Sequence, residues 1–115
     1  MGMDVIGMNP IAPEGEYFRA TIWAWDPIAA FVETVAPEEA KPCTHWHYND
    51  GDGLDAAQSV RLADRLQEAV ATGAINECLN ERQSYPDRDQ IAAVLSAGVP
   101  EFIRFLRACG GFEIW

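Results

Sequence analysis

Basic residues are scarce in this chain. Eight Lys and Arg stand against eighteen Asp and Glu among its 115 residues, which gives a net charge of −10, and only one of the eight is a lysine. Binding along a nucleic-acid backbone, or to an anionic membrane, needs a cluster of positive charge. No such cluster occurs in the sequence. We therefore expect neither nucleic acid nor a membrane as the partner.

Cysteines and long apolar runs are also few. The three cysteines, Cys43, Cys78 and Cys109, are widely spaced and form no Cys-x-x-Cys motif. This pattern disfavours a disulfide scaffold or a cysteine-rich zinc site and is typical of reduced thiols in a cytosolic protein. No run of about eighteen apolar residues exists, and the first residues lack the basic and apolar regions of a signal peptide. We therefore expect a cytoplasmic protein.

Size and hydrophobic content are those of one globular domain. The chain is 49% hydrophobic and 23% charged. A chain of this length can bury a core without disulfides or a metal. The sequence therefore predicts a single domain over residues 1–115.

The clearest periodic pattern predicts a helix over residues 56–72. Apolar residues recur there at spacings of three and four, while charged residues hold the opposite face. Asp55 is suited to cap the N-terminus of this helix, and Gln58 is placed to complete a capping box. Gly73 follows the last periodic residue and is typical of a helix end.

Weaker patterns predict further helices. Asp26-Pro27 is typical of a helix start and Pro37 of a stop. The segments with helical spacing of apolar residues cover 27–36, 74–82, 88–97 and 100–109. Residues 4–8 and the apolar tail at 112–115 are candidate strands that could pair with one another. The predicted fold class is therefore mainly α, one small domain of four to five helices with at most a short two-stranded pairing of the termini.

A polar stretch at residues 45–55 precedes the 56–72 helix. It is rich in Asn, Asp and Gly, which tolerate or supply the backbone conformations of tight turns. Loops held by a rigid element are where binding residues usually collect. A small-ligand site is therefore expected in this loop, walled by nearby tryptophans. The residues expected to bind are His47, Asn49, Asp50, Asp52, Trp46, Trp23 and Trp25.

The same stretch supports a metal-site hypothesis. His45 and His47 alternate, so both imidazoles point to one side of an extended segment, with Asp50 within reach. Two imidazoles and a carboxylate suit a divalent ion such as zinc, manganese or nickel. The favoured alternative is that one histidine bonds to backbone and the other faces solvent. No cofactor is therefore expected, and a divalent metal remains the alternative.

Tryptophan is abundant, with four in the chain. Aromatic side chains supply large buried areas, so the simplest role for each is core packing. The functional role is the wall of a pocket or of a partner surface. Trp23, Trp25 and Trp46 stand beside polar segments, so these three are expected to be partly exposed.

Four stretches spread over most of the chain carry a resemblance. They are Asp4-Val5-Ile6-Gly7 with Asn9-Pro10; Gly15-Glu16-Tyr17-Phe18-Arg19 with Trp23, Trp25 and Pro27; Trp46-His47 with Asn49-Asp50-Gly51-Asp52-Gly53-Leu54; and Phe105-Leu106-Arg107 with Gly110-Gly111-Phe112. Together they resemble a family of small uncharacterised bacterial and phage-type proteins. That family has a basic residue before the position of Pro27, where this chain has Asp26. The resemblance implies no activity.

Two functions from different classes follow from the sequence. The favoured one is a protein-interaction or binding module, acidic and small, that meets a protein partner or a second copy of itself through an apolar and aromatic patch. No catalytic motif is present to favour chemistry instead. The alternative is a small metal- or ligand-binding enzyme that uses the loop at 45–55.

Overall fold

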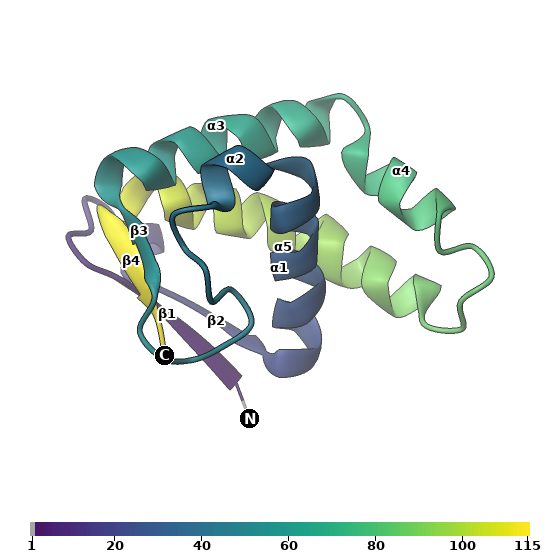
Figure 1. The fold of residues 1–115 in the computed structure, drawn as a ribbon, viewed down its shortest axis with the longest axis horizontal. Coiled ribbons are helices and arrows are strands. Elements are labelled where there is room, and N and C mark those ends of the chain that lie inside the picture. Colours follow the sequence, from purple (N-terminus) through teal and green to yellow (C-terminus); the bar gives the residue numbers. More distant parts are fainter. Residues whose placement is uncertain (1) are drawn as a thin grey trace.

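The computed structural model describes residues 2–115, which form one antiparallel sheet with helices packed on it (Figure 1). Its elements are β1 (Gly2–Gly7), the 3-10 helix η1 (Pro13–Gly15), β2 (Tyr17–Thr21), α1 (Ile22–Val35), α2 (Pro37–Ala40), β3 (Gly53–Asp55), α3 (Ala56–Ala71), α4 (Ala74–Asn80), α5 (Arg88–Ala108) and β4 (Gly111–Ile114). The strand order in the sheet is β2-β1-β4-β3.

The sheet corrects the predicted fold class. The expected pairing of the termini is present, because β1 and β4 are antiparallel with Val5 opposite Ile114. It is the centre of a four-stranded sheet, however, so the prediction of a mainly α fold with at most a two-stranded pairing is wrong. β2 joins β1 on one side and β3 joins β4 on the other. Both outer strands are short, and their conformation depends on partners far away in the sequence.

Gly53 shows why β3 was missed. In the sequence it is the second glycine of a polar turn, and turn formation is the usual reason for such a residue. In the structure, a β-carbon at Gly53 would lie 1.7 Å from the carbonyl oxygen of Phe112. Glycine in a strand often marks such a close approach of another backbone. The residue therefore permits pairing with β4.

Side chains on one face of the sheet form the core with the helices. Val5 and Ile114 from the central strands are fully buried. Phe18 of β2 packs against α5, with its ring centre 5.2 Å from that of Phe102 and 6.1 Å from that of Phe105. α1 and α3 pack against α5 as well. The core thus lies between the sheet and these three helices.

The helix predicted over 56–72 is confirmed as α3. The Asp55 carboxylate accepts a hydrogen bond from the Gln58 backbone N–H at 2.7 Å. The Gln58 side-chain oxygen accepts one from the Asp55 backbone N–H at 2.9 Å. Each residue therefore satisfies a backbone donor that the helix start leaves free, which is the predicted capping box.

Replacing Asp55 by alanine should remove this cap. We expect Asp55→Ala to lower the free energy of unfolding by about 1 kcal/mol, because a first-turn N–H loses its acceptor. The matched control is Asp55→Asn, whose amide oxygen can still accept and which should change stability by only a few tenths of a kcal/mol. Thermal melts of the three proteins test this. Equal midpoints for wild type and Asp55→Ala would contradict the role of the cap.

Two predicted helix boundaries are wrong. α1 begins five residues before Pro27, where the Thr21 hydroxyl accepts a hydrogen bond from the Ala24 N–H at 3.2 Å. The helices predicted over 88–97 and 100–109 are one helix, α5. Gly98 lies inside α5, and a β-carbon there would lie 2.7 Å from Ile28 Cδ1 of α1. It lets α1 and α5 pack closely.

All three cysteines are free thiols, as the sequence predicts. Burial is the main cause that raises the pKa of Cys43, to about 12, with the nearby Asp52 charge acting in the same direction. The thiolate is the nucleophilic form, so Cys43 is held in its unreactive state at neutral pH. Within residues 2–115, no helix combines the length and the apolar character that crossing a bilayer requires.

Candidate functional site

The loop between α2 and β3 is organised by one carboxylate. Asp52 Oδ2 accepts hydrogen bonds from the Thr44 N–H at 3.0 Å, the Thr44 hydroxyl at 3.0 Å and the His45 N–H at 3.1 Å. Burial alone would raise the pKa of Asp52, but these bonds and one from the Gly53 N–H outweigh it and lower the pKa. The Asp52 carboxylate therefore accepts its hydrogen bonds from the loop itself. This predicted binding residue has a structural role in the loop.

The two histidines of the loop point to different partners. His45 Nδ1 lies 2.7 Å from Asp50 Oδ2. His47 instead reaches α1, with Nδ1 at 3.1 Å from Asp26 Oδ1 and Nε2 at 2.7 Å from Glu33 Oε1. The structure thus brings His45 and Asp50 together but leaves His47 out of that pair. Across residues 2–115, no three His, Cys, Asp or Glu side chains gather in a way that could hold a metal ion.

The carboxylates beside His47 favour its charged form. Partial burial lowers the pKa of the imidazole, but the hydrogen bonds and charges of Asp26 and Glu33 outweigh it, so the pKa is raised. The geometry favours the same form, because both ring nitrogens lie within hydrogen-bonding distance of carboxylate oxygens and only the imidazolium can donate from both. His47 therefore bridges the loop and two turns of α1.

This bridge predicts a pH dependence of stability. The folded-state pKa of His47 lies above the unfolded value of about 6.5, so its stabilisation is complete below that value and is lost as the pH rises through the folded pKa. The free-energy difference between wild type and His47→Gln should therefore be larger at about pH 5.5 than at about pH 8.5. Because the His47 side chain is 39% exposed, we expect the bridge to contribute less than about 1 kcal/mol to the free energy of unfolding. Urea unfolding at both pH values measures it, and a difference that grows with pH would contradict the bridge.

The predicted tryptophan wall is divided between core and surface. Trp25 and Trp46 are buried at 0% and 2% exposure and stack with ring centres 6.2 Å apart, so the expected partial exposure of these two is wrong. Trp23 is 84% exposed. The difference arises because residues 22–25 form the first turn of α1, so the side chains at positions 23 and 25 point in different directions. Asn49, the remaining predicted binding residue, is exposed on the loop.

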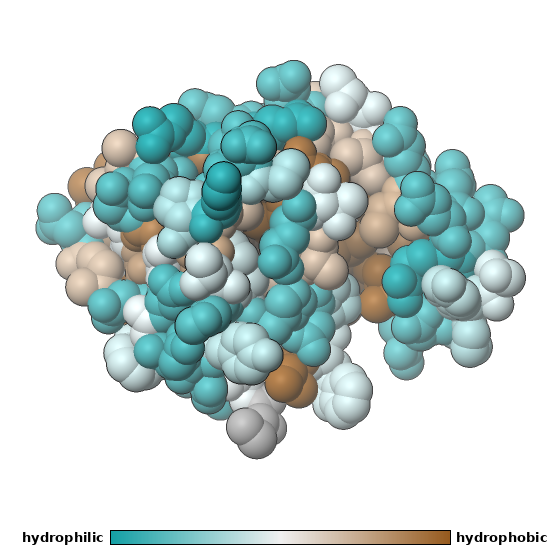
Figure 2. Space-filling model, viewed as in Figure 1, coloured by the Kyte–Doolittle hydropathy of each residue, from teal (hydrophilic) through white to brown (hydrophobic). Residues whose placement is uncertain are grey.

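A groove lies beside Trp23, between α1, α4 and the first half of α5. Its volume is about 650 Å³, and Figure 2 shows apolar residues at the base of a notch between the α4 side and the body of the molecule. Phe31 and Leu95 are buried beneath it, while Val35, Cys78 and Ile91 are partly exposed in its walls. The surface therefore has an apolar floor made from three separate helices.

The groove exists because α4 diverges from α3. Gly73 between these helices has φ of 90°, a left-handed conformation that side chains rarely adopt. α4 then packs against α3 and α5. The segment after α4 turns back into α5, so that α1 and α4 face one another across the N-terminal part of α5 (Figure 1).

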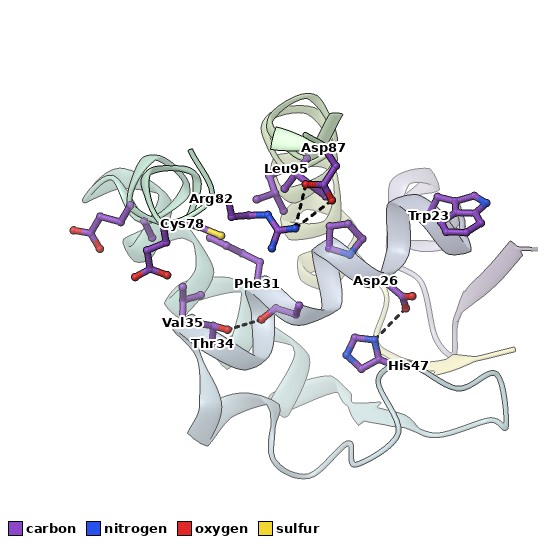
Figure 3. Close-up of a pocket in the computed structure, with 16 residues that line it drawn as sticks. Trp23, Asp26, Phe31, Thr34, Val35, His47, Cys78, Arg82, Asp87 and Leu95 are labelled. Atoms are coloured by element: carbon purple, nitrogen blue, oxygen red, sulfur yellow. Dashed lines mark hydrogen bonds and ion pairs between the residues drawn. The ribbon is translucent and has the colours of Figure 1, made fainter. Parts of the chain in front are cut away.

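The rim of the groove is acidic. Carboxylates line it from α1, from α4 and from the segment between α4 and α5; they are Asp26, Glu77, Glu81 and Asp87. The guanidinium of Arg82 pairs with Asp87 at 3.2 Å and lies 5.0 Å from the centre of the Tyr85 ring. His47 is likewise paired, with Asp26 (Figure 3). Both basic residues that line the groove are thus engaged by carboxylates, and the rim keeps a negative excess.

Only one end of this groove is lined by residues that the sequence predicted as site residues. Trp23 and His47 were predicted as site residues and do line it. The contributions of α4 and α5 were not foreseen, because which helix faces meet depends on tertiary packing. A signal was present in the spacing of Ala74 and Cys78, which lie four residues apart and therefore on one side of a helix.

Comparisons with models of known families, with curated proteins and with solved structures find no match to this chain.

Proposed function

We propose that this protein is a protein-interaction module, which binds a positively charged segment of a partner protein in the groove between α1, α4 and α5. The observation that carries the proposal is the combination of an apolar floor with a carboxylate rim in one concave surface. Apolar concavities with a few convergent polar groups are where proteins most often bind their ligands.

Exposed apolar surface supports a macromolecular partner. Trp23 is 84% exposed at the groove, and partly exposed Val35 and Ile91 continue the apolar surface inward. Burying a large apolar side chain contributes about 1.5–3 kcal/mol, and tryptophan is among the residues that dominate protein interfaces. A segment that covers the groove and Trp23 together would therefore gain binding energy from both.

Charge decides which kind of segment fits. The groove's carboxylates exceed its cations, and the whole chain carries a net charge of −10. A second copy of this chain would bring the same excess of negative charge, so self-association through the groove is disfavoured by repulsion. A segment with Lys or Arg beside apolar residues is complementary, and the charge also steers its approach.

Two synthetic basic peptides test the proposal by calorimetric titration. Both contain only leucine and lysine, one with leucines at helical spacing and the other with alternating leucines. We expect at least one to bind wild type. Ala30→Arg, which adds bulk and positive charge to the groove, should weaken that binding at least about tenfold. Ala57→Arg on α3 makes the same change away from the groove and should leave binding unchanged.

The same titration defines failure. Peptides with glutamate in place of lysine should not bind, because the rim would repel them. If neither basic peptide binds, or if Ala30→Arg and Ala57→Arg have equal effects on affinity, the groove is not an interaction site for a cationic segment. Circular dichroism of both variants shows that they retain the wild-type fold.

A further inference from the structure

We propose that the segment bound in the groove is a basic amphipathic α-helix, which lies between α1 and α4 on the N-terminal half of α5. This inference rests on the proposed function and names the class of partner. It follows from three features of the groove. Its walls are faces of helices, its lining includes no strand edge, and carboxylates lie on two of its sides.

Each wall of the groove is one face of a helix. α1 contributes Trp23, Pro27, Ala30 and Thr34; α4 contributes Ala74 and Cys78; and α5 contributes Ile91 and Leu95. These residues recur at spacings of three and four, which produces the ridges and grooves by which helices pack on one another. A fourth helix placed here would pack against α1, α4 and α5 as in a helix bundle.

The size of the groove suits a short helix. On α1 its lining runs from Trp23 to Val35, and the twelve helical steps between these residues span roughly 18 Å. Small residues, Ala30 on α1 and Ala74 on α4, line its two sides and leave space for the side chains of a bound helix. A partner segment of three to four turns, on the order of 12–15 residues, would cover that length.

Backbone hydrogen bonding favours a helix over an extended segment. An extended peptide gains most of its affinity by adding a strand to an open sheet edge. The groove lining comes from α1, α4, α5, the loop residue His47 and the segment between α4 and α5, with no contribution from any of the four strands. An extended backbone against these apolar walls would leave polar groups without partners, whereas a helix satisfies its own.

Negative charge lies on two sides of the groove. Asp26 is on the α1 side, and Glu77 and Glu81 are on the α4 side. A bound helix would therefore carry Lys or Arg on both sides of its apolar stripe, facing these carboxylates. Asp26 is already paired with His47, so we expect Glu77 and Glu81 to provide the larger part of the charge recognition.

The test compares the leucine-lysine peptides with helical and alternating leucine spacing, matched in length and composition. We expect the helically spaced peptide to bind wild type at least about tenfold more tightly than the alternating one. Its helical content by circular dichroism should rise on binding, because isolated helices of this length are marginal in water. Glu77→Lys with Glu81→Lys should weaken binding, and a peptide with glutamates on the facing side should restore it.

The outcomes separate this inference from the proposed function. Tighter or equal binding of the alternating peptide, blocked by Ala30→Arg, would overturn the helical partner while the interaction module stands. Absence of binding by both peptides would overturn both. If octylamine, a small amphipathic cation, competes for the groove as tightly as the helical peptide, the groove is a small-molecule site and the helical partner is wrong.

Discussion

Replacing Trp46 by alanine should lower the free energy of unfolding by about 3–5 kcal/mol, the usual cost of truncating a large buried aromatic side chain. The Trp46 indole is 2% exposed, stacks on Trp25 and donates a hydrogen bond from Nε1 to the Ala40 carbonyl oxygen at 3.0 Å. Truncation would leave a cavity at the centre of the aromatic core and would remove one of the two hydrogen bonds that the Ala40 carbonyl oxygen accepts, the other coming from the Cys43 N–H at 3.1 Å. Urea denaturation monitored by far-ultraviolet circular dichroism measures the loss.

Trp23→Ala is the matched control for this experiment. The same side chain is removed, but from a position that is 84% exposed, so stability should change by no more than about 0.5 kcal/mol. Equal losses for Trp46→Ala and Trp23→Ala would contradict the assignment of one tryptophan to the core and the other to the surface of the groove.

Deleting residues 112–115 should abolish cooperative folding. β4 lies between β1 and β3, so the deletion removes most of a central strand and separates its two neighbours. Phe112 and Ile114 are both buried in the core, and each contributes about 1.5–3 kcal/mol. With the lost sheet hydrogen bonds, this is comparable to the whole stability of a small domain. A thermal scan of the truncated protein should show no cooperative transition.

Removing Trp115 alone provides the control for the deletion. Its ring is 49% exposed, and its backbone exchanges two hydrogen bonds with Asp4, at 2.9 and 2.7 Å. We expect removal of Trp115 to lower the free energy of unfolding by less than the deletion does and to leave a cooperative thermal transition. If the protein without residues 112–115 melts at the same midpoint as the full-length protein, the central position of β4 is contradicted.

Local signals in the sequence predicted the parts of the fold that depend on near neighbours. The capping box at Asp55 and Gln58 is confirmed because both partners lie within one turn. The pairing of Val5 with the C-terminal tail is confirmed because several large apolar residues there needed burial. β2, β3 and the continuous α5 were missed because each depends on contacts distant in sequence. Gly98 beside Ile28 and Gly53 beside Phe112 are the clearest cases.

The candidate site shows the same limit. Alternation of His45 and His47 predicted that both rings would face one side, yet His47 turns to Asp26 and Glu33 on a helix whose start lies earlier than the sequence indicated. A wrong helix start also misplaced Trp25, which is buried. The groove needs the relative placement of three helices, and no spacing within one segment of sequence specifies that placement.

The most direct test of the interaction module maps the bound surface in solution. The helically spaced leucine-lysine peptide is titrated into ¹⁵N-labelled protein, and the backbone amide chemical shifts are followed. We predict that the largest changes cluster in α1, α4 and the first half of α5 and include the Trp23 indole N–H, while the sheet is unaffected. Changes confined to the loop at 45–55 or to the outer face of the sheet, or no changes at all, would contradict binding in the groove.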